Sequence, residues 1–70
     1  MNRGPYRLRD VARATGLPLR RVRSWVDAGV VDVLQPLPHM ERLVSREELQ
    51  RLGRDVGLRV DWEWLSRDTE

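Results

Sequence analysis

Residues 16–29, GLPLRRVRSWVDAG, place a short helix between two glycines. Pro18 suits the first turn of a helix, because the N–H that it lacks would have no partner there. The apolar residues that follow recur at the spacing of one helical face: Leu19, Val22, Trp25 and Val26. We therefore predict a helix over residues 18–28 that ends at Gly29 and packs its Trp25 into the core.

The opposite face of the 18–28 helix is polar and rich in arginine. Arg20 and Ser24 point most directly outward, and Arg21 and Arg23 lie on the flanks. A helix of about ten residues is ~15 Å long and enters a major groove that is about 12 Å wide. We assign Arg20 and Ser24 to base edges and Arg21 and Arg23 to phosphates, with a solvated charged face as the alternative. Asp27 on this face repels phosphate unless it pairs with Arg23 or accepts from a cytosine amine.

Charge is distributed unevenly along the chain. Residues 1–24 hold seven arginines and one acid (7 − 1 = +6), whereas residues 25–70 hold six arginines and ten acids (6 − 10 = −4). Such asymmetry indicates a polyanionic partner for the basic part. Every basic residue other than His39 is arginine, whose guanidinium suits bidentate contacts with phosphate and guanine. A GC-rich genome is an alternative cause of the all-arginine usage.

Size and composition exclude several classes of protein. Seventy residues predict one domain, which buries only ~60% of the surface of its unfolded chain. There is no cysteine, and the single histidine, His39, cannot build a metal site alone. We find no apolar run of the ~18 residues that span a bilayer and no signal peptide, so we expect a cytoplasmic protein. Without a nucleophile–base pair or a glycine-rich phosphate loop, we expect neither an enzyme nor a cofactor.

The segment before residue 16 predicts a loose tail and one helix. Residues 1–5 form the flexible tail, and the helix runs over residues 9–14 until Gly16 ends it. Its apolar positions follow helical spacing: Leu8, Val11, Ala12 and Thr15. Arg9 and Arg13 lie four residues apart on the outer face, where they either contact phosphates or only keep the domain soluble.

After Gly29 the sequence predicts a hairpin and then a helix. Residues 30–34 favour extended structure, residues 35–40 form a loop with two prolines, and residues 42–44 return as a strand. Ser45 and Glu48 form a capping box in which the hydroxyl accepts from the Glu48 amide and the carboxylate reaches back. This box opens a third helix, which turns Leu49 and Leu52 inward and ends before Gly57.

A short apolar segment with two tryptophans closes the chain. We predict one or two helical turns capped by Asp61. Trp62 and Trp64 are two residues apart, so a helix cannot bury both on one face. We expect one of them to pack on the core and the other to be partly exposed. The exposed indole either lies over a small core or contacts a protein partner.

The order helix, tight turn, helix, hairpin, helix resembles a winged helix-turn-helix. YRLRDVARATGLPLRRVRSWVDAGVV (6–31) resembles the N-terminal half of the MerR family and the related phage excisionases. The residues that carry this resemblance are Tyr6, Leu8, Ala12, Thr15-Gly16-Leu17, Trp25 and Gly29. RLVSREELQRL (42–52) resembles the returning wing with the next helix, and GLRVDWEWL (57–65) is similar to the start of a fourth helix.

This resemblance implies a mainly α, small winged helix-turn-helix domain over residues 6–66. Three to four short helices and a two-stranded hairpin wing would make up the domain, followed by a tail over 67–70. The implied function is that of a bacterial or phage protein that binds double-stranded DNA through helix 18–28. Its role would be a small transcriptional regulator or an excisionase-like recombination directionality factor. In that docking geometry Arg9 and Arg13 face the DNA backbone, and Arg42 is the basic residue of the wing.

The wing departs from the pattern of this family. Its tip, residues 36–41, carries no arginine, whereas wings of the family usually carry glycine and several basic residues. Contact of the wing with DNA is therefore an open question, as is the choice between a homodimer and a cooperative array. The rival hypothesis is a protein-interaction module that binds RNA polymerase, a recombinase or another regulator.

Overall fold

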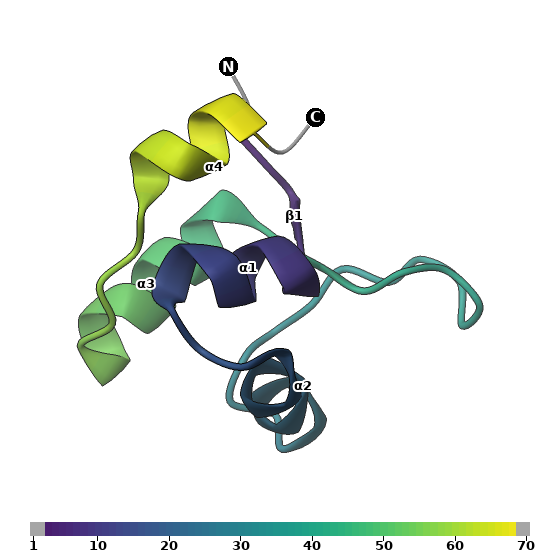
Figure 1. Ribbon diagram of the computed structural model, residues 1–70. Helices are drawn as coiled ribbons and strands as arrows, with labels where there is room; N and C mark the ends of the chain where they lie inside the picture. The colour runs from purple at the N-terminus through teal and green to yellow at the C-terminus, as the bar shows by residue number, and fades with distance from the viewer. Residues whose placement is uncertain (1–2, 69–70) are drawn as a thin grey trace.

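The computed structural model describes residues 3–68, and the outermost parts of both predicted tails, 1–2 and 69–70, lie outside the described residues. The chain is a small, mainly helical domain with a two-stranded antiparallel sheet. Its elements are β1 (Tyr6–Arg7), α1 (Leu8–Thr15), α2 (Leu19–Asp27), β2 (Leu43–Val44), α3 (Arg46–Val56) and α4 (Trp62–Asp68). α1 lies in the centre, α2 packs on one side of it and α4 on the other (Figure 1).

The first two helices begin and end close to where the sequence predicts. Gly16 ends α1 in the left-handed conformation with φ 73°, which glycine adopts without steric cost. α1 extends one residue further at each end than predicted, and Arg7 is its N-cap. Pro18 is the N-cap of α2 and precedes its first turn, because its ψ of 144° is extended. The two helices are therefore joined by a turn of three residues, 16–18.

The predicted hairpin of residues 30–44 is reduced to one antiparallel bridge, and the main partner of β2 lies elsewhere. β2 pairs with β1, which places Tyr6 opposite Val44 and Arg7 opposite Leu43. Between Leu34 and Leu43 there is a single bridge, with N–O distances of 2.7 and 3.0 Å. The two prolines that follow Leu34 donate no N–H, so a ladder cannot continue toward the tip. A buried Tyr6 makes β1 the better partner for β2.

The core lies between α1, α3, α4 and the sheet. Its buried side chains are Tyr6, Leu8, Val11, Ala12, Ala14, Val22, Val31, Val44, Leu49, Leu52 and Leu65. Trp25 packs against this cluster but is only partly buried, which corrects the prediction that its indole is enclosed. The reason is that α2 lies at the edge of the domain, where α1 is the one helix with which it makes substantial contact.

α4 is fixed to the rest of the domain by Tyr6, Arg46 and Trp62. The Tyr6 hydroxyl accepts a hydrogen bond of 3.1 Å from Arg46 Nη1, and the Arg46 guanidinium lies 4.8 Å from the centroid of the Trp62 ring. Asp61 caps α4, as predicted, by accepting from the Trp64 amide at 3.0 Å. Both Trp62 and Trp64 pack against the core and both are partly exposed, so the structure does not divide them into one packed and one partly exposed indole.

Glu48 ties the segment that leaves α2 to α3. Ser45 caps α3 as predicted, since its Oγ accepts from the Glu48 amide at 3.0 Å. The Glu48 carboxylate does not reach back to this cap but accepts from the Asp32 amide at 2.9 Å and from Arg51 Nε at 2.9 Å. Arg51 also donates to the Val30 carbonyl at 3.0 Å. Hydrogen bonding to Arg51, and to the Asp32 amide, lowers the pKa of Glu48.

Candidate nucleic-acid interface

α2 presents most of its surface to solvent. Val22 is its one fully buried residue, and Leu19, Trp25 and Val26 are partly buried on the same side. The tight turn at residues 16–18 sets α2 against α1 (Figure 1), and the three arginines of α2 are all exposed. This arrangement follows from local sequence, because the apolar stripe of α2 covers only one side of the helix.

The structure exposes the residues that the sequence assigns to DNA on α1 and α2. All six have exposed side chains: Arg9 and Arg13 on α1, and Arg20, Arg21, Arg23 and Ser24 on α2. Among residues 3–68, these five guanidiniums form no ion pair or hydrogen bond with another protein group. Their full charge is therefore available to an external anion.

Charges on α2 run opposite to what stabilises a helix. A helix favours acids in its first turn and bases in its last turn, by ~0.3–1 kcal/mol for each charge. α2 has Arg20 and Arg21 in its first turn and no acid there, and it ends at Asp27 with no base in its last turn. α3 follows the favourable order, with Glu47 and Glu48 first and Arg54 last. The pattern of α2 thus lowers the stability of its own helix and favours a bound anion near its N-terminal half.

Asp27 pairs with Arg42 and not with Arg23. Arg42 Nη1 lies 2.9 Å from Asp27 Oδ1, and the two side chains are 31% and 69% exposed. The fold therefore brings Arg42, which precedes β2, to the C-terminal end of the α2 surface, meaning the exposed side of α2 that carries Arg20, Arg21, Arg23 and Ser24. Of the seven predicted site residues, Arg42 is the one whose charge is already neutralised by a partner on the domain. The sequence favoured Arg23 as the partner of Asp27, because these two residues have the i, i+4 spacing of neighbours on a helix.

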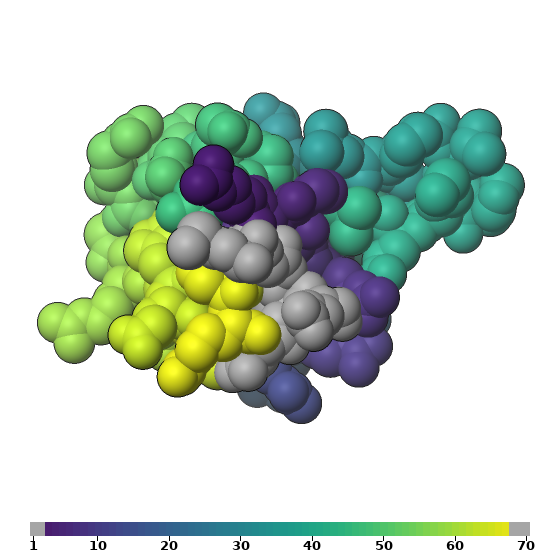
Figure 2. Space-filling view, turned by 90° about the horizontal axis from the view of Figure 1, so that it is seen from above, coloured from purple at the N-terminus to yellow at the C-terminus, as the bar shows by residue number. Residues whose placement is uncertain are grey.

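The loop between α2 and β2 projects from the body of the domain (Figures 1 and 2). A turn at its tip joins the Met40 amide to the Leu37 carbonyl at 3.0 Å, and Gln35 Nε2 donates to the Met40 carbonyl at 2.7 Å. The side chains of Leu37 and Met40 are 49% and 46% exposed. Among the described residues, one ion pair involves a residue of the tip: Arg7 Nε lies 3.5 Å from Glu41 Oε2. The tip is thus a hydrogen-bonded turn that exposes two apolar side chains and carries no arginine.

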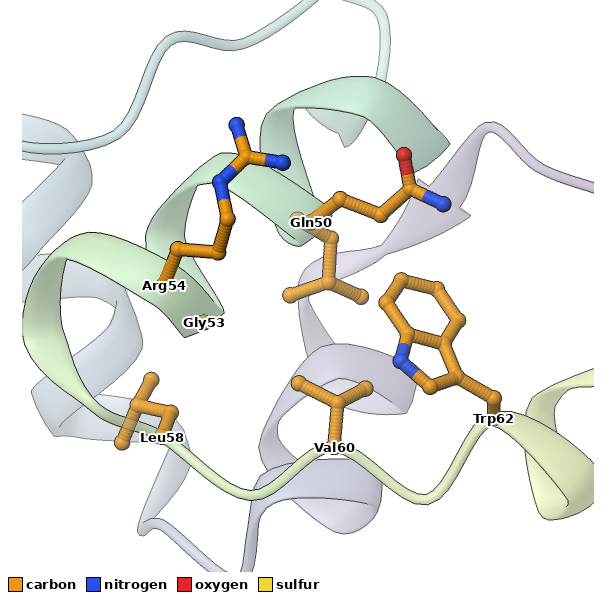
Figure 3. Close-up of a pocket in the computed structure, with 7 residues that line it drawn as sticks. Gln50, Gly53, Arg54, Leu58, Val60 and Trp62 are labelled. Atoms are coloured by element: carbon orange, nitrogen blue, oxygen red, sulfur yellow. The ribbon is translucent and has the colours of Figure 1, made fainter.

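A second surface lies between α3 and the segment that leads into α4. A hollow of about 430 Å³ is lined by Leu49, Gln50, Gly53, Arg54, Leu58, Val60 and Trp62 (Figure 3). Arg54 is exposed and makes no ion pair within the described part of the chain. This hollow could not be predicted from the sequence, because residues 49–54 and 58–62 belong to separate segments that only the fold brings together. The nearest signal was the pair of tryptophans at 62 and 64.

Two kinds of feature were not found among the described residues, a metal-ligand cluster and a membrane-spanning helix. Across residues 3–68, no three His, Asp or Glu side chains gather as a metal ion would require. No helix in that range has the length and apolar character needed to cross a membrane. Comparison of the chain with protein-family models, with curated proteins and with solved structures finds no match.

Proposed function

We propose that this protein binds double-stranded DNA as a small winged helix-turn-helix, with α2 in the major groove. Its role would be that of a transcriptional regulator or an excisionase-like recombination directionality factor. The proposal rests above all on the outward side of α2, where Arg20, Arg21 and Arg23 are exposed and unpaired among the described residues. A polyanion satisfies these charges and also the N-terminal end of the helix dipole.

Each exposed residue has a role in this docking geometry. Arg20 and Ser24 lie most directly outward on α2 and would contact base edges. Arg21 and Arg23 flank them and would contact phosphates on either side of the groove. Arg9 and Arg13 on α1 would contact the backbone that the first helix crosses. Four phosphate contacts predict that log K falls with log salt at a slope of about −3.6, from about −0.9 for each contact.

The test is a titration of fluorescein-labelled random duplex DNA, followed by anisotropy at several salt concentrations. A slope of about −3.6 corresponds to a loss of roughly 150-fold in affinity between 50 and 200 mM salt. The double variant Arg21→Gln/Arg23→Gln should make the slope shallower by about 1.8.

Arg54 and Arg59 provide the matched control for this experiment. Both are exposed, lie outside α1 and α2, and make no ion pair among the described residues. The double variant Arg54→Gln/Arg59→Gln removes the same charge and should leave the slope near the wild-type value. Equal effects of the two double variants would mean that net charge, and not the α2 surface, determines binding.

The rival function, a protein-interaction module, is favoured by the exposed apolar side chains at the tip of the loop. Leu37 and Met40 are exposed there on a turn held by Gln35, and such a tip offers an anchor to another protein. Absence of measurable binding to duplex DNA at 50 mM salt would favour this function over DNA binding.

A further inference from the structure

We infer that Asp27 withholds Arg42 from the DNA backbone, so that the Asp27–Arg42 pair restrains sequence-independent binding. This inference rests on the proposed function and specifies how the α2 surface is regulated. It makes Asp27 a residue that limits sequence-independent binding, through Arg42 as well as through its own charge.

The geometry of the pair carries the first step. Asp27 is seven residues after Arg20, which places the two on nearly the same side of α2 at 100° per residue. Arg42 reaches this side from outside the helix and meets Asp27 Oδ1 at 2.9 Å. A phosphate that approaches the C-terminal end of α2 therefore meets a neutralised cation and an exposed carboxylate. Without Asp27, it would meet a free guanidinium.

The position of Asp27 in the helix carries the second step. An acid at the last residue of a helix interacts unfavourably with the helix dipole, so Asp27 does not serve the stability of α2. It also does not neutralise the nearest cation on its own helix, Arg23, which remains without an ion-pair partner among the described residues. The contact that Asp27 makes is the one with Arg42. Its effect is to cancel one cation on the surface proposed to contact DNA.

The third step is the effect on binding that follows. Release of Arg42 adds one phosphate contact, which steepens the slope of log K against log salt by about 0.9. The ratio of the Asp27→Asn and wild-type affinities for random duplex should therefore grow about 3.5-fold as salt falls from 200 to 50 mM. Asn has the same shape as Asp, and the carboxylate is largely exposed, so the fold should be retained. Far-ultraviolet circular dichroism and tryptophan fluorescence check this directly.

A double-mutant cycle separates the release of Arg42 from simple loss of a negative charge. The variants are Asp27→Asn, Arg42→Gln and both together, each titrated with the same random duplex at 50 to 200 mM salt. We expect Arg42→Gln to reduce affinity more in the Asp27→Asn background than in the wild type, and to remove the additional slope. Glu63→Gln is the control, because it removes one exposed carboxylate from the Arg67–Glu63 pair on α4. Its slope should remain that of the wild type.

Three results would overturn the inference. An unchanged or shallower slope in Asp27→Asn would show that Arg42 does not gain a phosphate. An equal effect of Asp27→Asn with and without Arg42 would show that the carboxylate acts by its own repulsion alone. The same slope increase in Glu63→Gln would show a general effect of charge. These outcomes differ from failure of the proposed function, in which the wild type itself shows no salt-dependent binding.

Discussion

Replacement of Glu48 by alanine tests how the segment that follows α2 is held. The side chain is 11% exposed and accepts hydrogen bonds from the Asp32 amide and from Arg51. Hydrogen bonds to charged groups contribute ~1.5–3 kcal/mol each when both partners are withdrawn from water. The Asp32 amide can regain water and Arg51 keeps its ion pair with Asp55 at 3.0 Å, so we expect a net loss of ~2 kcal/mol.

Such a loss is large for a domain of this size. In domains of 60–100 residues 1 kcal/mol lowers Tm by about 4–8 °C, so Glu48→Ala should lower Tm by roughly 8–16 °C. The effect should also depend on pH. Folding lowers the pKa of Glu48 below its unfolded value of 4.5. The contribution of this carboxylate to the free energy of unfolding is therefore complete above pH 4.5. That contribution is lost as pH falls through the folded pKa, so the wild type and Glu48→Ala should converge in stability below pH 4.5.

The assay is urea unfolding followed by tryptophan fluorescence, at pH 7 and at several values below pH 4.5. Glu47→Ala is the matched control, because Glu47 is the exposed neighbour in the same first turn of α3. It shares the favourable interaction with the helix dipole but none of the hydrogen bonds to Asp32 and Arg51. Equal free energies of unfolding for the two variants at pH 7 would refute the reasoning.

Three further changes test the local structure around the proposed surface. Trp25→Ala should cost ~2–3 kcal/mol in urea unfolding, less than the ~3–5 of an enclosed aromatic residue, and the folded protein should keep its affinity for DNA. A loss of DNA affinity without a loss of stability would place the indole at the interface. Gly16→Ala should cost ~1 kcal/mol, because φ is 73° and the new Cβ meets no atom within 4 Å; Gly16→Asn should cost less. Ser45→Ala should lower the free energy of unfolding by ~1 kcal/mol through loss of the α3 cap, and Ser45→Asp should retain it.

Much of the helical structure could be predicted because its signals are local. The apolar spacing and the glycines at 16 and 57 gave the helices to within one or two residues, as did the cap at Ser45. The pairing of β2 was missed because Tyr6 and Val44 are far apart in the sequence, and because residues 30–34 offered a nearer and equally extended partner. A strand of two residues, such as β1, has no periodicity from which to predict it.

The candidate site divides in the same way. The outward placement of Arg20, Arg21, Arg23 and Ser24 follows from their angles around one helix, and their side chains are exposed as expected. The partner of Asp27 depended on the path of the loop after α2, and therefore on contacts between residues distant in the sequence. The predicted contact of the Glu48 carboxylate was also wrong. Ser45 followed by Glu48 is the pattern of a capping box, but in the fold the carboxylate accepts from the distant Asp32 amide.

By itself, the sequence determined where the helices lie and which side of each helix is apolar. It also determined that positive charge gathers in residues 1–24, because these properties depend on residues within about one helical turn or on composition. The tertiary structure alone decided that β2 pairs with β1, that Trp25 stays partly open, and that Arg42 is neutralised. The five arginines assigned to DNA on α1 and α2 have no ion-pair partner among the described residues. Ion pairs and strand pairs form between whichever groups folding brings within about 4 Å, and that proximity is not a property of any local stretch of sequence.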